Sequence, residues 1–261
     1  MLTTSIFPGR YVQGYDAIQS LGKEAKRFGE QALLLLDPFV ADELFPTFEA
    51  NLKSELKFHT ERFTGEASDE EVERLSEVVR QSGDEVVIGV GGGKTLDTAK
   101  AVAYTSRIPV LIVPTIASTD APTSSLSVIY SEQGEHLTEY FYDHSPNMLV
   151  VDTEIIVNAP VRFLVSGMGD ALATWTETRA NNIADNANWV NANDGGYRKT
   201  LVGTAVSRLC YDTLLAKGAM AKLSAEQKVI TEAFEDVVEA NILLSGLGFE
   251  NNGVAGAHAV G

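Results

Sequence analysis

The chain has 261 residues and carries 36 acidic against 20 basic side chains, which gives a net charge of −16. Nucleic acid and anionic membrane surfaces repel such a protein, so we exclude both as partners and expect a small-molecule ligand. With 44% hydrophobic residues, no membrane-length apolar run and a single cysteine, Cys210, the composition predicts a cytoplasmic globular protein without an internal disulfide.

Short apolar runs alternate with amphipathic stretches over the first part of the chain. Runs such as 33–36, four leucines in a row, suit strands that are covered on both faces, as in a parallel sheet. The pattern predicts an α/β fold with strands at 31–36, 55–63, 85–90, 109–113 and 148–151 and helices at 38–50, 68–82 and 93–105.

A hairpin is expected at 127–141, after the fourth of these strands, because turn-forming residues lie in the middle of that stretch. Strand signals stop near Pro160, and helical patterns follow at about 160–180, 196–217 and 224–248, with a polar segment at 181–194. We therefore expect an α/β domain over 1–159 and an all-helical domain over 160–261.

Three glycines, Gly91 to Gly93, join a predicted strand directly to a predicted helix that begins with Lys94. Glycines allow a ligand to approach the backbone, and the first N–H groups of a helix attract an anion, so this loop is a candidate phosphate site. A Walker loop would need glycine at Ile88, and a Rossmann loop would need it at Leu96. The alternative is a tight turn that binds no ligand.

Polar side chains follow two of the predicted strands. Asp37 comes directly after the leucine run. It could accept hydrogen bonds from a ribose, or it could cap the helix that Pro38 begins. The sequence favours neither role over the other. The loop at 114–127 is rich in hydroxyl side chains and contains Asp120, which could accept from a substrate hydroxyl. Alternatively, these hydroxyls cap their own backbone.

Asp170 and His258 lie in apolar helical patterns in the second half. A buried carboxylate must be capped, paired or bound to a metal, whereas a lone histidine is more often a core residue. The two residues would form a convincing zinc or iron site only with a third ligand. His59, His136 and His144 lie in strands or loops, and we interpret them as solvated.

The segments 91–100, 114–122, 167–175 and 256–260 together resemble the iron- or zinc-dependent alcohol dehydrogenase family, in its glycerol-oxidising branch. The resemblance covers the whole chain. It implies metal-assisted hydride transfer from glycerol, or a related small polyol, to NAD, with dihydroxyacetone as the product from glycerol and zinc or iron as the metal.

The resemblance also implies a role for each matching residue. Asp37 would bind the adenosine ribose, Asp120 the substrate hydroxyls, and Asp170 and His258 the metal. The remaining cofactor-binding residues would hold the pyrophosphate or line the path to the nicotinamide: Gly91, Gly92, Gly93, Lys94, Thr95, Leu96, Asp97, Thr115, Ser118, Ser124, Leu126 and Tyr130.

One difference from the family concerns the metal. The family has a further histidine ligand downstream of the position matching His258, whereas the sequence stops at Gly261. We therefore expect a C-terminally truncated chain with an incomplete metal site and little activity. Separately, the family resemblance implies that the protein forms a homo-oligomer. The alternatives are a non-catalytic NAD-binding remnant, or a subunit that a partner completes.

Two related enzymes are further alternatives, glycerol-1-phosphate dehydrogenase and dehydroquinate synthase. Both act on phosphorylated or acidic substrates and would be expected to place additional basic residues around Asp120, which this sequence does not have.

Overall fold

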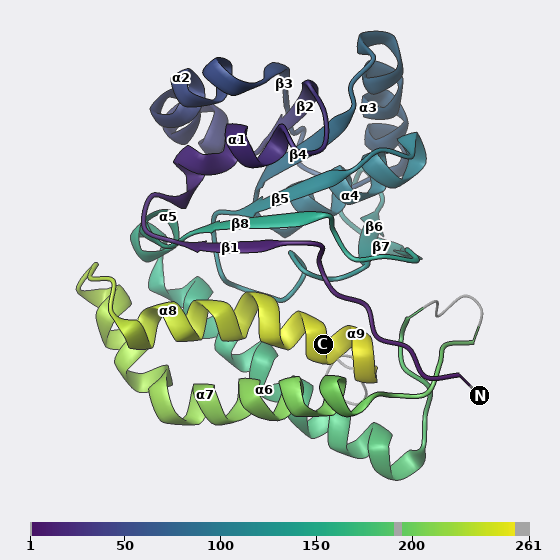
Figure 1. The fold of residues 1–261 in the computed structure, drawn as a ribbon, viewed down its shortest axis with the longest axis vertical. Coiled ribbons are helices and arrows are strands. Elements are labelled where there is room, and N and C mark those ends of the chain that lie inside the picture. The colour runs from purple at the N-terminus through teal and green to yellow at the C-terminus, as the bar shows by residue number, and fades with distance from the viewer. Residues whose placement is uncertain (1, 191–194, 254–261) are drawn as a thin grey trace.

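A six-stranded sheet organises the first part of the chain. The computed structural model describes residues 2–190 and 195–253. All pairings in this sheet are parallel, and the strand order is β1-β8-β5-β4-β2-β3 (Figure 1). The strands are β1 Tyr11–Gly14, β2 Gln31–Leu36, β3 Lys57–Arg62, β4 Val86–Gly91, β5 Val110–Pro114 and β8 Met148–Asp152.

The leucine run of β2 shows why these strands form the centre of the sheet. Leu33 and Leu35 pack into one hydrophobic cluster, while Leu34 and Leu36 pack into another on the opposite face. All four side chains are at most 2% exposed. A strand buried on both faces needs apolar residues at every position, so the predicted parallel α/β fold is confirmed.

Helices cover both faces of the sheet. Leu21 of α1 (Leu21–Ala25) and Phe48 of α2 (Phe45–Glu55) belong to the cluster around Leu34. Leu75 of α3 (Asp69–Ser82) and Leu96 of α4 (Gly93–Ser106) belong to the cluster around Leu33. The predicted hairpin is present as β6 (Leu126–Tyr130) and β7 (His136–Phe141), which form a separate antiparallel pair.

Helices make up the second part of the chain. After the short α5 (Thr153–Asn158) come α6 (Val161–Ala184), α7 (Leu201–Glu226), α8 (Glu232–Glu239) and α9 (Ser245–Asn252), with a π-helical turn at Ala240–Leu244 between the last two. Figure 1 shows α6 to α9 gathered beside β1. Their apolar residues, among them Cys210 and Phe234, join the cluster around Leu33, so the core is continuous.

Several elements differ from the sequence-based expectation; the helix expected at 196–217, for example, continues to Glu226 as α7. The last predicted helix, at 224–248, instead starts at Glu232, because the chain turns at Lys228 with φ 55° and Thr231 then caps α8. Strand β1 was not predicted. It pairs with β8 at the register Tyr11↔Leu149 and lies at the edge of the sheet nearest the helices (Figure 1).

The N-terminal segment also contacts the helical part directly. Ile6 donates its N–H to Asn251 Oδ1 at 2.9 Å and accepts from Asn251 Nδ2 at 3.0 Å. Gln13 Nε2 donates to the carbonyl of Glu235 at 3.0 Å. The first described residues are therefore held against α8 and α9. Within residues 2–190 and 195–253, none of the helices has the length and apolar character to cross a membrane.

Candidate active site

The strand order places Asp37 and the glycine loop together. The chain runs from β2 to β3 in one direction along the sheet and from β4 to β5 in the other, so a crevice opens at the carboxyl ends of the neighbouring strands β2 and β4. Asp37 follows β2, and Gly92 follows β4. A Cβ on Gly91 would lie 2.8 Å from Asp37 Cβ, so this close approach requires a glycine.

The glycine loop leaves the start of α4 open. Gly92 is the N-cap of this helix and provides no side-chain hydrogen bond. A Cβ on Gly93 would meet no heavy atom within 4 Å. A tight turn accounts for Gly91 but not for Gly93, which faces empty space beside the first N–H groups of a 14-residue helix. This arrangement fits an anionic group of a ligand.

Asp37 makes the capping bond that the sequence suggested. Its Oδ1 accepts from the N–H of Phe39 at 2.9 Å. The residue also lines a cavity of about 840 Å³ together with Gly92 and Thr115. Capping and ligand contact are therefore compatible in one side chain, and the ribose role of Asp37 stays a prediction.

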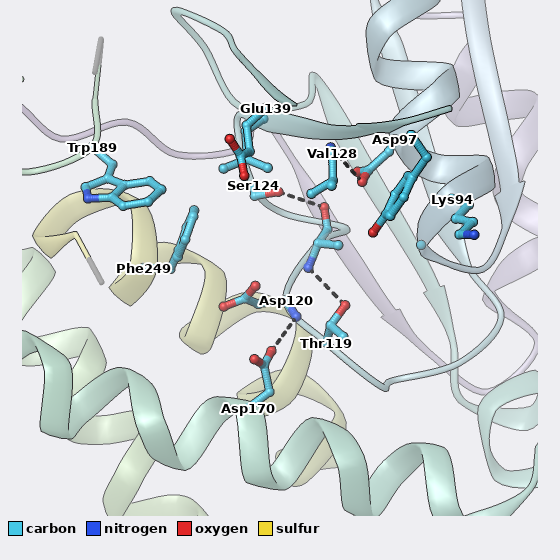
Figure 2. A pocket seen from close by; sticks show the side chains of 14 residues that line it. Lys94, Asp97, Thr119, Asp120, Ser124, Val128, Glu139, Asp170, Trp189 and Phe249 are labelled. Atoms are coloured by element: carbon cyan, nitrogen blue, oxygen red, sulfur yellow. Dashed lines mark hydrogen bonds between the residues drawn. The ribbon is translucent and has the colours of Figure 1, made fainter. Parts of the chain in front are cut away.

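A second cavity, of about 570 Å³, is lined by Gly93, whereas Gly92 lines the first (Figure 2). Eight of the predicted site residues line it: Gly93, Lys94, Asp97, Asp120, Ser124, Leu126, Tyr130 and Asp170. Thr115 lines the first cavity instead, and Ser118 lines neither. Thr95 and Leu96 are at most 2% exposed, so only their backbones could face a ligand.

Lys94 stands at the entrance to α4 with its charge already paired. Its Nζ lies 2.6 Å from Glu66 Oε2 and 4.7 Å from the centroid of the Tyr130 ring. Both ion-pair partners are partly exposed, so the pair is weak and an anion that enters the cavity can replace Glu66.

Two of the carboxylates that line the second cavity, Asp120 and Asp170, come from different parts of the chain and meet there. Asp170, on α6, accepts from the N–H of Asp120 at 3.1 Å, and Figure 2 shows this bond. Asp120 in turn accepts from Ser245 Oγ of α9 at 2.8 Å. Helix α6 approaches this loop closely, since a Cβ on Gly167 would lie 2.1 Å from the carbonyl oxygen of Ala117. Burial and the nearby charges of Asp120 and Asp170 raise the pKa of the Cys210 thiol to about 12, so the thiol is un-ionised.

The expected metal ligands are only partly described. Asp170 lies in the second cavity, whereas His258 lies outside the described residues. Residues 2–190 and 195–253 contain no group of three histidine, cysteine or acidic side chains that could hold a metal ion. Of the two expected metal ligands, the described residues therefore include Asp170 and not His258.

The interpretation of the other histidines was correct for two of the three. The side chains of His136 and His144 are more than half exposed. His59 is instead partly buried, with Nδ1 3.5 Å from Asp84 Oδ1, because edge strand β3 lies against the residues that follow α3.

Several lining residues were missed from sequence. Val128 lies between Leu126 and Tyr130 on the same face of β6, so the alternation of that strand could have identified it. Trp189 and Phe249 come from outside the recognised segments, and their ring centroids are 5.3 Å apart at the edge of the cavity (Figure 2). No local signal in the sequence marks these two aromatic residues.

Comparisons with known proteins agree with this geometry. The family model described as iron-containing alcohol dehydrogenase matches residues 8–153. The glycerol dehydrogenase of Thermotoga maritima is 52% identical over 260 residues, and that of Citrobacter freundii is 47% identical over 261; the alignments cover all of this chain and 70% of each relative. The solved structure of a probable glycerol dehydrogenase from Sinorhizobium meliloti superposes with a TM-score of 0.92 at 40% identity, covering all of this chain and 70% of that one.

Proposed function

Because the chain belongs to the iron-containing alcohol dehydrogenase family, we propose that it binds NAD across the glycine loop and takes glycerol, or a similar small polyol, beside Asp120. The observation that carries this proposal is the open start of α4 at Gly93, with one cavity lined by Gly92 and another lined by Gly93. In this proposal residues 1–159 form the NAD-binding domain, and residues 160–261 contribute the helical part of the substrate site.

A dinucleotide would span the two cavities. The cavity with Asp37 and Thr115 would hold the adenosine end, where the carboxylate of Asp37 accepts from ribose hydroxyls. The N–H groups at the start of α4 and the ammonium group of Lys94 would hold the pyrophosphate, because both favour negative charge. The second cavity would then receive the nicotinamide, which accepts a hydride when it is bound there.

The walls of the second cavity suit such a transfer. Leu126, Val128, Trp189 and Phe249 provide apolar surface that excludes water from the reacting carbon. Asp120 stands among them and is 8% exposed, with its Oδ2 already accepting from Ser245. A carboxylate held in this way accepts hydrogen bonds from substrate hydroxyls and fixes the orientation of the polyol.

A second candidate function is NAD binding without turnover. Among the described residues Asp170 represents the expected metal ligands, since His258 lies outside them.

Two measurements on the purified chain test these proposals. Calorimetry is expected to show binding of NAD, and a folded chain that binds no NAD would contradict both candidates. NADH formation is then followed at 340 nm with glycerol and added zinc, and with glycerol 1-phosphate as the comparison substrate. Turnover of glycerol supports the dehydrogenase, NAD binding without turnover supports the second candidate, and preferential turnover of the phosphate ester would contradict the polyol assignment.

A further inference from the structure

The polar loop between β5 and β6 supplies much of the second cavity but has little regular structure of its own. Thr119, Asp120, Ala121 and Ser124 from this loop all line the cavity. One hydrogen bond between backbone groups, from Thr123 N to Asp120 O at 3.0 Å, closes a turn within it. Two side-chain bonds within the loop add to it, from Ala121 N to Thr119 Oγ1 at 3.3 Å and from Ser124 Oγ to Ala121 O at 3.0 Å. The rest of the loop's shape depends on groups outside it.

Lys100 makes four of the hydrogen bonds that reach this loop from outside it. It lies on α4, two turns after the glycine loop, and is only 3% exposed. Its Nζ lies within hydrogen-bonding distance of the carbonyl oxygens of Ala121, Ser124 and Leu126 and of Ser124 Oγ, between 2.5 and 3.3 Å, and its three N–H groups are shared among them. One ammonium group thus gathers three backbone carbonyls that lie within six residues of each other.

The charge of Lys100 is balanced inside the protein. Its Nζ lies 2.8 Å from Asp97 Oδ1, and Asp97 Oδ2 accepts from the N–H of Val128 at 3.1 Å. Asp97 is 5% exposed, so this ion pair is removed from solvent. Breaking such a pair from one side is strongly unfavourable, because the remaining charge stays buried.

A buried carboxyl group holds the same loop from the helical side. Glu250, on α9, accepts from the N–H of Ser125 and, at 2.9 Å, from Ser145 Oγ. The residue is 1% exposed. The loop is therefore fixed between α4, through Lys100, and α9, through Glu250.

We propose that Lys100 is a positioning residue that shapes the nicotinamide and substrate end of the site through the loop at 119–126, without contacting the ligand itself. The inference rests on the proposed NAD site. The inference assigns different roles to two lysines that are six residues apart. Lys94 is partly exposed beside the glycine loop, whereas Lys100 contacts the backbone carbonyls of residues 121–126. Substitution of Lys100 is expected to disturb one end of the dinucleotide site and leave the other intact.

The test compares two ligands on the full chain. ADP-ribose has the adenosine, the pyrophosphate and a ribose of NAD but lacks the nicotinamide ring, so the ratio of the two dissociation constants reports the nicotinamide end alone. In Lys100→Met, calorimetry is expected to show NAD binding weakened by about tenfold, equivalent to about 1.4 kcal/mol, with ADP-ribose binding within about twofold of the unmodified chain. Lys217→Met is the matched control, since Lys217 pairs with Glu232 and Asp236 on the helices, and it should change neither constant.

A merely structural role would weaken both ligands together or lower the folded fraction, so circular dichroism accompanies each measurement. If Lys100→Met does not fold, Lys100→Arg keeps the positive charge opposite Asp97, but its planar donors cannot reproduce the set of contacts around one nitrogen. An unchanged ratio in either folded variant overturns the inference. Failure of the unmodified chain to bind both NAD and ADP-ribose would instead contradict the proposed function.

Discussion

Replacement of Gly93 by alanine should separate folding from ligand binding. Gly93 is the first residue of α4, and a Cβ there meets no heavy atom of the described chain within 4 Å. Alanine is compatible with the helical backbone and restricts the unfolded chain, so Gly93→Ala is expected to stabilise the fold by about 0.4–1 kcal/mol. The corresponding rise in melting temperature is about 1–4 °C for a chain of this size.

The same methyl group should weaken NAD binding. It would project into the space beside the first N–H groups of α4, where the pyrophosphate is proposed to lie. Forcing a methyl group into a close contact costs about 1–3 kcal/mol, which corresponds to an increase in the dissociation constant of about fivefold to more than a hundredfold. Calorimetry with NAD measures this loss, and thermal unfolding without ligand measures the stability.

Gly89→Ala is the control with the opposite expectation. A Cβ on Gly89 would lie 2.6 Å from Ala99 Cβ, so this variant should lose stability through overpacking within the fold. If Gly93→Ala binds NAD as tightly as the unmodified chain, the pyrophosphate does not lie against this glycine. If Gly93→Ala melts below the unmodified chain, the space beside it is not open.

Three further predictions concern other parts of the site. In Asp37→Ser the serine can still cap the helix, so the free energy of unfolding in urea should change by no more than about 0.5 kcal/mol. The affinity for NAD, measured by calorimetry, should fall about tenfold. An unchanged affinity would exclude the ribose role. Burial raises the pKa of Glu250 from 4.5 to about 7, so the folded state keeps this proton to a higher pH than the unfolded state does. The free energy of unfolding should therefore fall by about 3 kcal/mol between pH 4.5 and pH 7, relative to Glu250→Gln. Parallel pH profiles of the two proteins in urea unfolding would contradict this. Gly167→Ala should lower the free energy of unfolding in urea by about 1–3 kcal/mol or more, because its Cβ would lie 2.1 Å from a backbone oxygen. Gly169→Ala is the control, since its Cβ would meet no heavy atom within 4 Å, and it should not destabilise the chain. Equal effects of the two substitutions would refute the close approach of α6.

The sheet was predictable where burial on both faces leaves a continuous apolar run. The run at 33–36 identified β2 with its observed bounds, and the neighbouring strands followed within two residues at each end. Strand β1 lacks that signal, because Tyr11–Gly14 is an edge strand of four half-buried residues that includes Gln13 and Gly14. Its position depends on pairing with β8, which is distant in sequence.

The site was predictable where one segment carries the contact, as in the glycine loop. It was not predictable where distant segments meet. Lys100 looks like an ordinary helical lysine in the sequence, and only the fold shows that its ammonium group contacts the carbonyls of residues 121–126. Trp189 and Phe249 likewise reach the cavity through the packing of the helical part against the hairpin, where the rings of Phe141 and Trp189 are 5.6 Å apart between centroids.

The pairing of β1 with β8 has a consequence for how the chain is made. Tyr11 lies beside Leu149, so about 138 residues separate the two partners (149 − 11). At about 5–20 residues per second, a ribosome needs roughly 7–28 s to synthesise that interval. During this time the N-terminal segment has no strand to pair with and its apolar residues stay accessible. Completion of this edge of the sheet should therefore be a late step in the synthesis and folding of the chain.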